Sequence, residues 1–152
     1  MDIKKTIAVF FVCLGCLGGP AASAIAQTSW LTVVGDSADP KIDTIEVDPI
    51  AIATDGAMRT MRIRVSRPLE RTSTDGVVFM SYRAVVLFDC NTRSARFLSA
   101  DFYRSALWQG EPNDSVVYAA NVVRPLAFRG FEPNPVVRIV RAACQGANGE
   151  KK

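Results

Sequence analysis

The most regular pattern along the chain is an alternation of apolar and polar side chains. It is longest over residues 77–88, where Val78, Tyr82 and Phe88 fall on the same side. Because successive side chains of a strand point to opposite faces, this alternation predicts a β-strand. The other side of the run is also partly apolar, so we expect the strand to be covered on both faces.

Shorter runs predict further strands beside it. Met61, Ile63 and Val65 alternate with polar residues, two of them arginines, which predicts a half-buried strand with a basic outer face. The dipeptide Asp55-Gly56 favours a tight turn just before it. The predicted strand segments are residues 30–34, 44–47, 50–54, 60–66, 77–88, 93–98 and 102–107. Residues 67–76 and 108–115 are predicted loops, and residues 116–128 fit either a strand or a helix.

The last apolar segment has the period of a helix. Asn134 is a favourable N-cap, Pro135 is a favoured first helical residue, and Gly146 is a suitable end. Arg138 and Arg141 lie on the polar side. The pattern predicts a C-terminal helix that packs one face against the sheet. Its apolar stripe consists of Val136, Val137, Ile139, Val140, Ala143 and Cys144.

The N-terminal segment has the pattern of an export signal. Lys4 and Lys5 precede an apolar run, and small residues follow that run. This order predicts a signal peptide over residues 1–26, cleaved before Gln27. The run is about 12 residues long, shorter than the roughly 20 that cross a bilayer, so we expect no transmembrane span after processing.

A second processing route stays open, because Leu14-Gly15-Cys16 resembles the end of a bacterial lipoprotein cleavage box. Acylation of Cys16 would anchor the protein to a membrane. By either route we expect the protein in the periplasm or at the outer-membrane surface. The rest of the chain is predicted as one domain, residues 27–146, and a flexible polar tail, residues 147–152.

Composition narrows the functional classes. The chain has 152 residues, 49% of them hydrophobic, and a formal net charge of +3, which is too small to indicate nucleic-acid binding. It has no histidine, which excludes Ser-His and Cys-His nucleophile pairs and zinc sites that use histidine. We therefore expect no catalytic residue, no cofactor and no bound metal.

The cysteines indicate a structural bond. Loss of the signal peptide leaves Cys90 and Cys144, and a single pair in an oxidising compartment indicates a disulfide. Cys90 continues the longest predicted strand, and Cys144 belongs to the helical stripe. The predicted fold class is α+β and mainly β: a single antiparallel sheet of about six strands, with a C-terminal helix tied to it by a disulfide.

Arginines supply the candidate partner-binding residues. The stretch between residues 59 and 71 is basic and suits an acidic protein or an anionic glycan. The alternative is a solvated strand face and loop whose charges prevent edge-to-edge aggregation. The candidates are Arg59, Arg62, Arg64, Arg67 and Arg71.

Other polar and aromatic clusters have two interpretations each. Asp36, Asp39 and Asp43 suit Ca²⁺ by residue type but lack the pattern of an EF-hand loop, so a solvated loop is favoured. Asp89 is interpreted as hydrogen-bonded or arginine-paired at a strand end rather than as a general acid. A last group is either a contact patch or core. It comprises Tyr103, Trp108 and Tyr118.

Taken together, these features resemble the surface-adhesin protein E family of Gram-negative bacteria. The resemblance covers most of residues 30–144 and implies one sheet with a C-terminal helix tied to it by the Cys90–Cys144 disulfide. It is carried by Trp30, the run Tyr82-Arg83-Ala84-Val85-Val86-Leu87-Phe88-Asp89-Cys90, then Arg96, Tyr103, Phe131-Glu132-Pro133-Asn134 and Cys144.

The resemblance implies binding, since family members are adhesins for host matrix and plasma proteins. We therefore expect an exported, non-enzymatic binding module that recognises a host or envelope protein. One alternative is a periplasmic structural or accessory protein that binds a bacterial partner, or forms a homodimer through an exposed sheet edge. Another is a hydrolase, whose signature would be two carboxylates buried together in a cleft.

Overall fold

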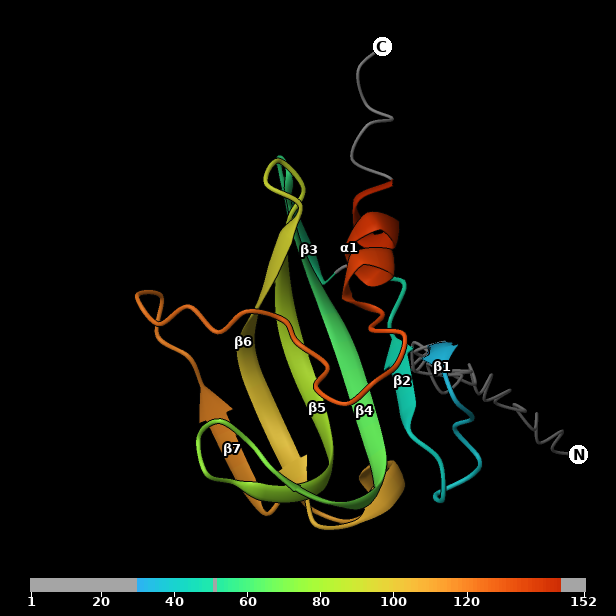
Figure 1. The fold of residues 1–152 in the computed structure, drawn as a ribbon. Coiled ribbons are helices and arrows are strands. Elements are labelled where there is room, and N and C mark those ends of the chain that lie inside the picture. The colour runs from blue at the N-terminus through green and yellow to red at the C-terminus, as the bar shows by residue number, and fades with distance from the viewer. Residues whose placement is uncertain (1–29, 51, 146–152) are drawn as a thin grey trace, which may run out of the picture.

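A computed structural model describes residues 30–50 and 52–145, so the predicted signal peptide, Cys16, Gly146 and the predicted tail lie outside the described residues. Seven strands form one antiparallel sheet in the order β1-β2-β4-β5-β6-β7, with β3 paired to β4 beside that path (Figure 1). The predicted fold class is confirmed. The elements are β1 (Leu31–Val34), β2 (Thr44–Val47), β3 (Ala53–Asp55), β4 (Met58–Thr72), β5 (Val78–Asp89), β6 (Ser94–Tyr103), the 3₁₀ turn η1 (Ala106–Trp108), β7 (Asp114–Val117) and α1 (Val136–Cys144).

β4 extends further than its alternation predicts. It runs to Thr72, although the sequence predicts a loop from Arg67 onward. Its pairing register with β5 shifts between Ser66 and Arg71. Such an irregularity accommodates Pro68, which has no N–H to donate to a neighbouring strand. The predicted start of the loop is therefore wrong.

β6 is one continuous strand where the sequence predicts two. A register shift against β5 places Phe97 opposite Val86 but Ser99 opposite Val85. Leu98 is the extra residue of this bulge, and it interrupts the alternation on which the prediction depends. The sequence predicts a break at residues 99–101, but Ser99 and Asp101 belong to the strand and lie opposite Val85 and Arg83 on the face away from the core.

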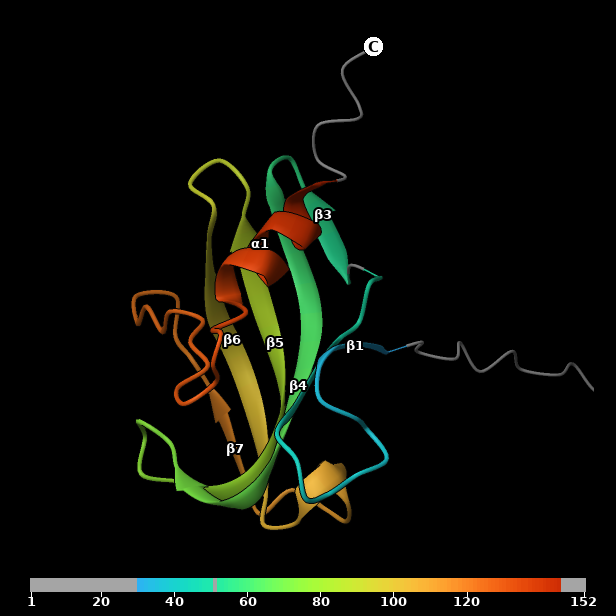
Figure 2. The ribbon, with the colours of Figure 1, turned by 45° about the vertical axis from the view of Figure 1, so that its right-hand side comes forward.

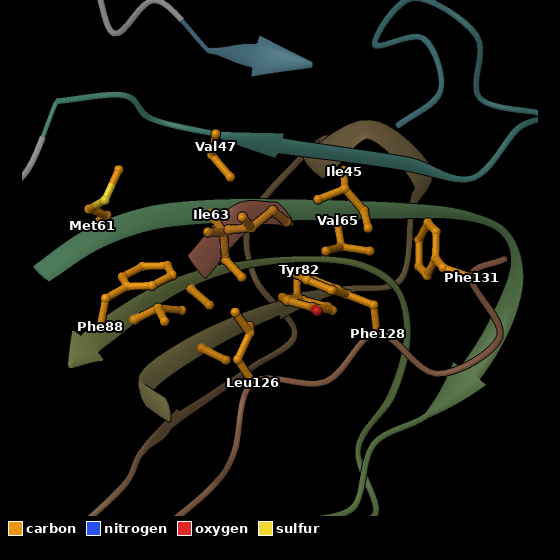
Figure 3. Close-up of a cluster of buried hydrophobic side chains, with 14 of the residues drawn as sticks. Ile45, Val47, Met61, Ile63, Val65, Tyr82, Phe88, Leu126, Phe128 and Phe131 are labelled. Carbon is orange, nitrogen blue, oxygen red and sulfur yellow. The ribbon is translucent and has the colours of Figure 1, made fainter. Parts of the chain in front are cut away.

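The hydrophobic core lies on one face of the sheet, beneath α1 and the covering segment, residues 119–135 (Figures 1 and 2). This segment includes most of the region that fits either a strand or a helix by sequence. It crosses the sheet as irregular chain, with one isolated bridge between Arg96 and Pro125 among the described pairs. Figure 3 shows side chains of the sheet meeting those of the cover. The labelled core residues are Ile45, Val47, Met61, Ile63, Val65, Tyr82, Phe88, Leu126, Phe128 and Phe131.

α1 begins at Val136, one residue later than predicted. Pro135 therefore occupies the N-cap position, so the predicted places of Asn134 and Pro135 are each wrong by one residue, although Asn134 Oδ1 still accepts the N–H of Val136 at 3.1 Å. Ile139 and Val140 are buried, as the stripe predicts, but Val137 is 69% exposed. The place of Val137 in the predicted stripe is wrong, because this residue lies about 100° around the helix axis from Val136 and faces away from the sheet.

A disulfide joins α1 to the sheet, as predicted. Cys90 directly follows β5 and is bonded to Cys144 at the end of α1, with the two Cα atoms 5.4 Å apart. Figure 2 shows α1 lying across β4 and β5 towards the end of the sheet where this link forms. The bond therefore fixes the cover of the core at its C-terminal end.

Candidate functional site

The five candidate arginines do not share one surface. Arg62 and Arg64 point to the sheet face opposite the core, since they alternate with buried residues of β4. Arg67 and Arg71, at and beyond the register shift, line a cavity on the core side. Arg59 lies near the β3–β4 turn and hydrogen-bonds to β3. The sheet face that carries Arg62, Arg64 and Arg83 is called the open face.

Arg64 occupies the middle of the open face. Its guanidinium carbon lies 4.3 Å from the ring centroid of Trp30 and 4.1 Å from that of Trp108. Its Nε donates to Glu46 Oε2 at 2.6 Å. Two aromatic planes and a carboxylate each attract the cation, and the side chain of Arg64 is only 18% exposed. Arg64 is therefore mainly engaged with other residues of the chain, and little of its side chain is accessible to a partner.

Trp108 comes from η1 and is fixed by polar groups of the sheet. Its indole Nε1 donates to the carbonyl oxygens of Val65 and Tyr82, at 3.0 Å each. The backbone of η1 is left-handed, with φ 55° at Leu107 and 58° at Trp108, a conformation that costs free energy unless neighbours hold it. The Trp108 N–H donates to Ser81 Oγ at 3.0 Å and so helps to hold the turn.

Two further arginines flank Arg64 and are more accessible. Arg62 pairs with Asp48 at 3.3 Å, while its side chain is 47% exposed. Arg83 is exposed, lies opposite Arg64 in the β4–β5 register, and has its guanidinium carbon 5.5 Å from the ring centroid of Tyr103. A hollow of about 420 Å³ lies among these side chains. Its lining includes Trp30, Arg62, Arg64, Arg83, Ser99 and Asp101.

Two carboxylates are buried at the border of the open face, and each has its own arginine. Glu46 also accepts a hydrogen bond from Thr32 Oγ1 at 3.1 Å, and Asp48 accepts the N–H of Ile50 at 3.0 Å. A general acid or base must be free to exchange a proton with a substrate. These two carboxylates are instead engaged in ion pairs with Arg64 and Arg62, and they hold these arginines in place on the open face.

The other acidic candidates have local structural roles. Asp36 and Asp39 accept backbone N–H groups in the loop before β2, and Asp43 belongs to an ion pair on the core side. Within residues 30–50 and 52–145, no group of three or more His, Cys, Asp or Glu side chains is placed to hold a metal ion. Hydrogen bonds from Thr92 lower the pKa of Asp89, which confirms its hydrogen-bonded place at a strand end.

Arg67 ties three parts of the chain together on the core side. Its Nη1 donates to Asp43 Oδ2 at 2.8 Å, and its Nη2 donates to the carbonyl oxygen of Arg129. Its guanidinium carbon lies 3.6 Å from the ring centroid of Phe131. Burial lowers the pKa of Arg67, and the charge of Asp43 opposes that shift. Arg67 is therefore engaged within the chain.

Sequence reasoning missed part of this arrangement. Arg83 lies on the second, partly apolar side of the longest predicted strand, and a charged residue within that side is the available signal. Nothing in the local sequence marks the burial of Glu46, because it depends on a partner in β4. The sequence leaves open whether Tyr103, Trp108 and Tyr118 form a contact patch or belong to the core. Tyr103 and Trp108 are buried and therefore packed within the protein, whereas Tyr118 lines the cavity on the core side.

The fold defines a class of small proteins in which a disulfide-tethered C-terminal helix covers one face of a single antiparallel sheet. The family model of surface-adhesin protein E matches residues 30–145, and the chain belongs to that family. Membership in an adhesin family points to a protein that binds other proteins at an exposed surface. No curated protein and no solved structure matches the chain. No helix in the described part of the chain is long and apolar enough to span a membrane.

Proposed function

We propose that this protein is an exported, non-enzymatic binding module that recognises an acidic surface of a host or envelope protein through its open face. The observation that carries the assignment is the placement of two accessible arginines next to the fixed Arg64: Arg62 two residues along β4 and Arg83 directly across on β5. The family supports the binding role. The predicted signal peptide supports export to the periplasm or the outer-membrane surface, with lipidation at Cys16 as the alternative form.

The chemistry of this face suits a protein partner. Arginine and tryptophan are enriched at the energetic centres of interfaces, and both are present here, with Trp30 beside the hollow. Guanidinium groups held by neighbours lose little conformational freedom when a carboxylate binds. Arg62 and Arg83 keep accessible donors, so an acidic segment laid across β4 and β5 meets both.

The test is a binding assay of the exported protein against matrix proteins, plasma proteins and solubilised native envelope proteins. Substituting both Arg62→Gln and Arg83→Gln is expected to weaken a saturable interaction about tenfold or more. The matched control carries Arg59→Gln and Arg71→Gln, which remove the same charge away from the open face, and it should bind within about twofold of the parent. If none of the tested proteins binds saturably, the binding role is overturned. If the control variant loses as much affinity as the Arg62 and Arg83 variant, the open face is not the binding site.

The accessory-protein alternative also has a specific observation in its favour. β7 ends the sheet path, and its Val117 is 82% exposed. The N–H of Tyr118 donates to β6, so the neighbouring N–H of Val117 points outward, where a bacterial partner or a second copy could add a strand. Val117→Pro removes that outward donor and should abolish a homodimer or envelope complex formed at this edge. An unchanged complex, in sedimentation or pull-down, would exclude the edge.

A further inference from the structure

A cavity of about 350 Å³ lies on the core side of the sheet, away from the open face. Aromatic residues of β5 and β6 form its floor, and the covering segment forms the opposite wall. Its size and its mixture of apolar walls with a few polar groups are those of a small-molecule site. The aromatic lining includes Phe79, Tyr82, Phe97, Phe102, Phe128 and Phe131.

Tyr82 places an unused donor in this lining. The residue is only 9% exposed, and its hydroxyl forms no side-chain hydrogen bond with another described residue, but it is not sealed within protein like the buried Nε of Arg124. Burial raises the pKa of Tyr82, so the hydroxyl keeps its proton. In Figure 3 the Tyr82 ring lies within the core cluster beside Phe128, with its hydroxyl oxygen at the tip. A hydroxyl that borders the cavity and forms no hydrogen bond within the chain is free to donate to an occupant of the cavity.

Arginines make the same cavity attractive to an anion. Arg124 pairs with Asp75, but its buried Nε has no hydrogen-bond partner in the described structure. Arg71 and Arg129 also line the cavity, are exposed, and form no ion pair with any described carboxylate. Cations around an apolar hollow concentrate their field within it. The cavity therefore combines an apolar floor, unused donors and unpaired positive charge.

We propose that this cavity binds a small amphipathic carboxylate, whose aromatic or short aliphatic body packs on the phenylalanine floor. Its carboxylate oxygens accept hydrogen bonds from donors that the chain leaves free, with Arg71 and Arg129 supplying the charge. Arg67 is already engaged with Asp43 and shapes the wall. The ligand class follows from the lining: the apolar floor disfavours a bare inorganic anion, and the arginines disfavour an amine.

The test uses three probes of one shape on the exported, disulfide-bonded protein: 4-phenylbutyrate, 4-phenylbutanol and 4-phenylbutylamine, each titrated by calorimetry. The acid is expected to bind about tenfold more tightly than the alcohol, because a charged acceptor makes the stronger hydrogen bonds. The amine should not bind. No saturable binding of the acid at millimolar concentration overturns the proposal. Equal affinity for acid and alcohol overturns its anionic part.

Two variants separate a ligand contact from a structural role. Tyr82→Phe keeps the ring and removes the free hydroxyl. It should lower the affinity for 4-phenylbutyrate roughly three- to tenfold and leave the melting temperature unchanged or higher. Arg71→Gln with Arg129→Gln should remove the preference of the acid over the alcohol. A lower melting temperature with unchanged affinity in Tyr82→Phe would assign the hydroxyl to folding and overturn its role.

The opposite-face variant makes this proposal independent of protein recognition. Arg62→Gln with Arg83→Gln removes the same charge as the Arg71 and Arg129 pair, but from the open face. It should leave the affinity for 4-phenylbutyrate unchanged. If it lowers the affinity for 4-phenylbutyrate as much as the Arg71 and Arg129 variant does, net charge rather than the cavity governs binding, and the site is excluded.

Discussion

Trp108 holds Arg64 in place by spanning the two longest strands of the sheet. The ring centroid of Trp108 lies 4.1 Å from the Arg64 guanidinium carbon, and its indole nitrogen donates to one carbonyl oxygen on β4 and one on β5. The same guanidinium donates to the buried Glu46. The open face is therefore built on a support that couples η1, β2 and β4. The accessible Arg62 and Arg83 lie next to this support, one along β4 and the other across on β5.

Arg64→Ala should destabilise the fold strongly. The change leaves the Glu46 carboxylate buried without its cation, and removing one partner of a buried ion pair costs about 3–5 kcal/mol. Because Arg64 keeps some contact with water, we expect about 2–4 kcal/mol in urea unfolding. Adding Glu46→Gln should recover part of this loss, and a purely additive pair would show that the two side chains are not coupled.

The disulfide should carry a large share of the stability. Cys90 and Cys144 are separated by 54 positions, and closure of a loop of that size is worth about 4 kcal/mol in the unfolded-chain model. Cys90→Ser with Cys144→Ser should lower the free energy of unfolding by about that amount. A matched comparison is the parent protein in reductant, which should unfold at the same urea concentration as the double variant. A loss well below 1 kcal/mol would show that the cover is held by its packing alone.

Positions on α1 should differ sharply in their tolerance. Ile139→Ala opens a void in the core and is expected to cost about 2–4 kcal/mol, whereas Val137→Ala changes an exposed side chain and should stay within about 0.5 kcal/mol. Chemical denaturation of the two variants is the measurement. Similar losses at both positions would contradict the observed orientation of the helix.

Alkaline pH should weaken the fold through its tyrosines. Burial, followed by the hydrogen bond to Asp75 and the charge of Asp75, raises the pKa of Tyr118 to about 12. A raised pKa in the folded state means that the stabilisation is complete below the unfolded value of about 10 and is lost as pH rises towards 12. The pKa of Tyr82 is raised in the same direction.

Urea unfolding at pH 9, 10 and 11 measures this dependence. The parent should lose stability over that range, and Tyr118→Phe should lose less, because one of the two linked groups has been removed. Lysine and arginine contributions are common to both proteins and cancel in the comparison. Identical slopes for parent and variant would show that Tyr118 titrates alike in the folded and unfolded states.

The sequence is sufficient for features that depend on neighbours along the chain. The strand around Tyr82 and the cysteine pair are both carried by local period or residue type, and both are confirmed. It fails where the period is interrupted: Leu98 shifts the phase of β6, and Pro68 marks a loop where the strand in fact continues through an irregularity. The polar residues that follow these points, such as Ser99 and Asp101 after Leu98, resemble turn residues in the sequence although they belong to strands.

The candidate site is only partly predictable for the same reason. Alternation along β4 correctly puts Arg62 and Arg64 on one face. It cannot reveal that Arg64 meets Trp108, because that contact depends on a turn 42 to 44 positions further along the chain. Arg67 follows the phase of the buried Ile63 and Val65, so alternation already puts it on the core side, and Arg71, beyond the register shift, lines the same cavity. One basic stretch of sequence thus becomes two separate surfaces.

Arginine labelling of the protein in complex with its partner tests the central claim most directly. Once a binding partner is captured, the exported protein is treated with an arginine-specific glyoxal reagent, alone and in the complex, and the modified positions are identified by mass spectrometry. If the open face is the binding site, Arg62 and Arg83 are protected in the complex while Arg59, Arg71 and Arg129 stay reactive. Protection of Arg71 and Arg129 with Arg62 and Arg83 still reactive would contradict recognition through the open face.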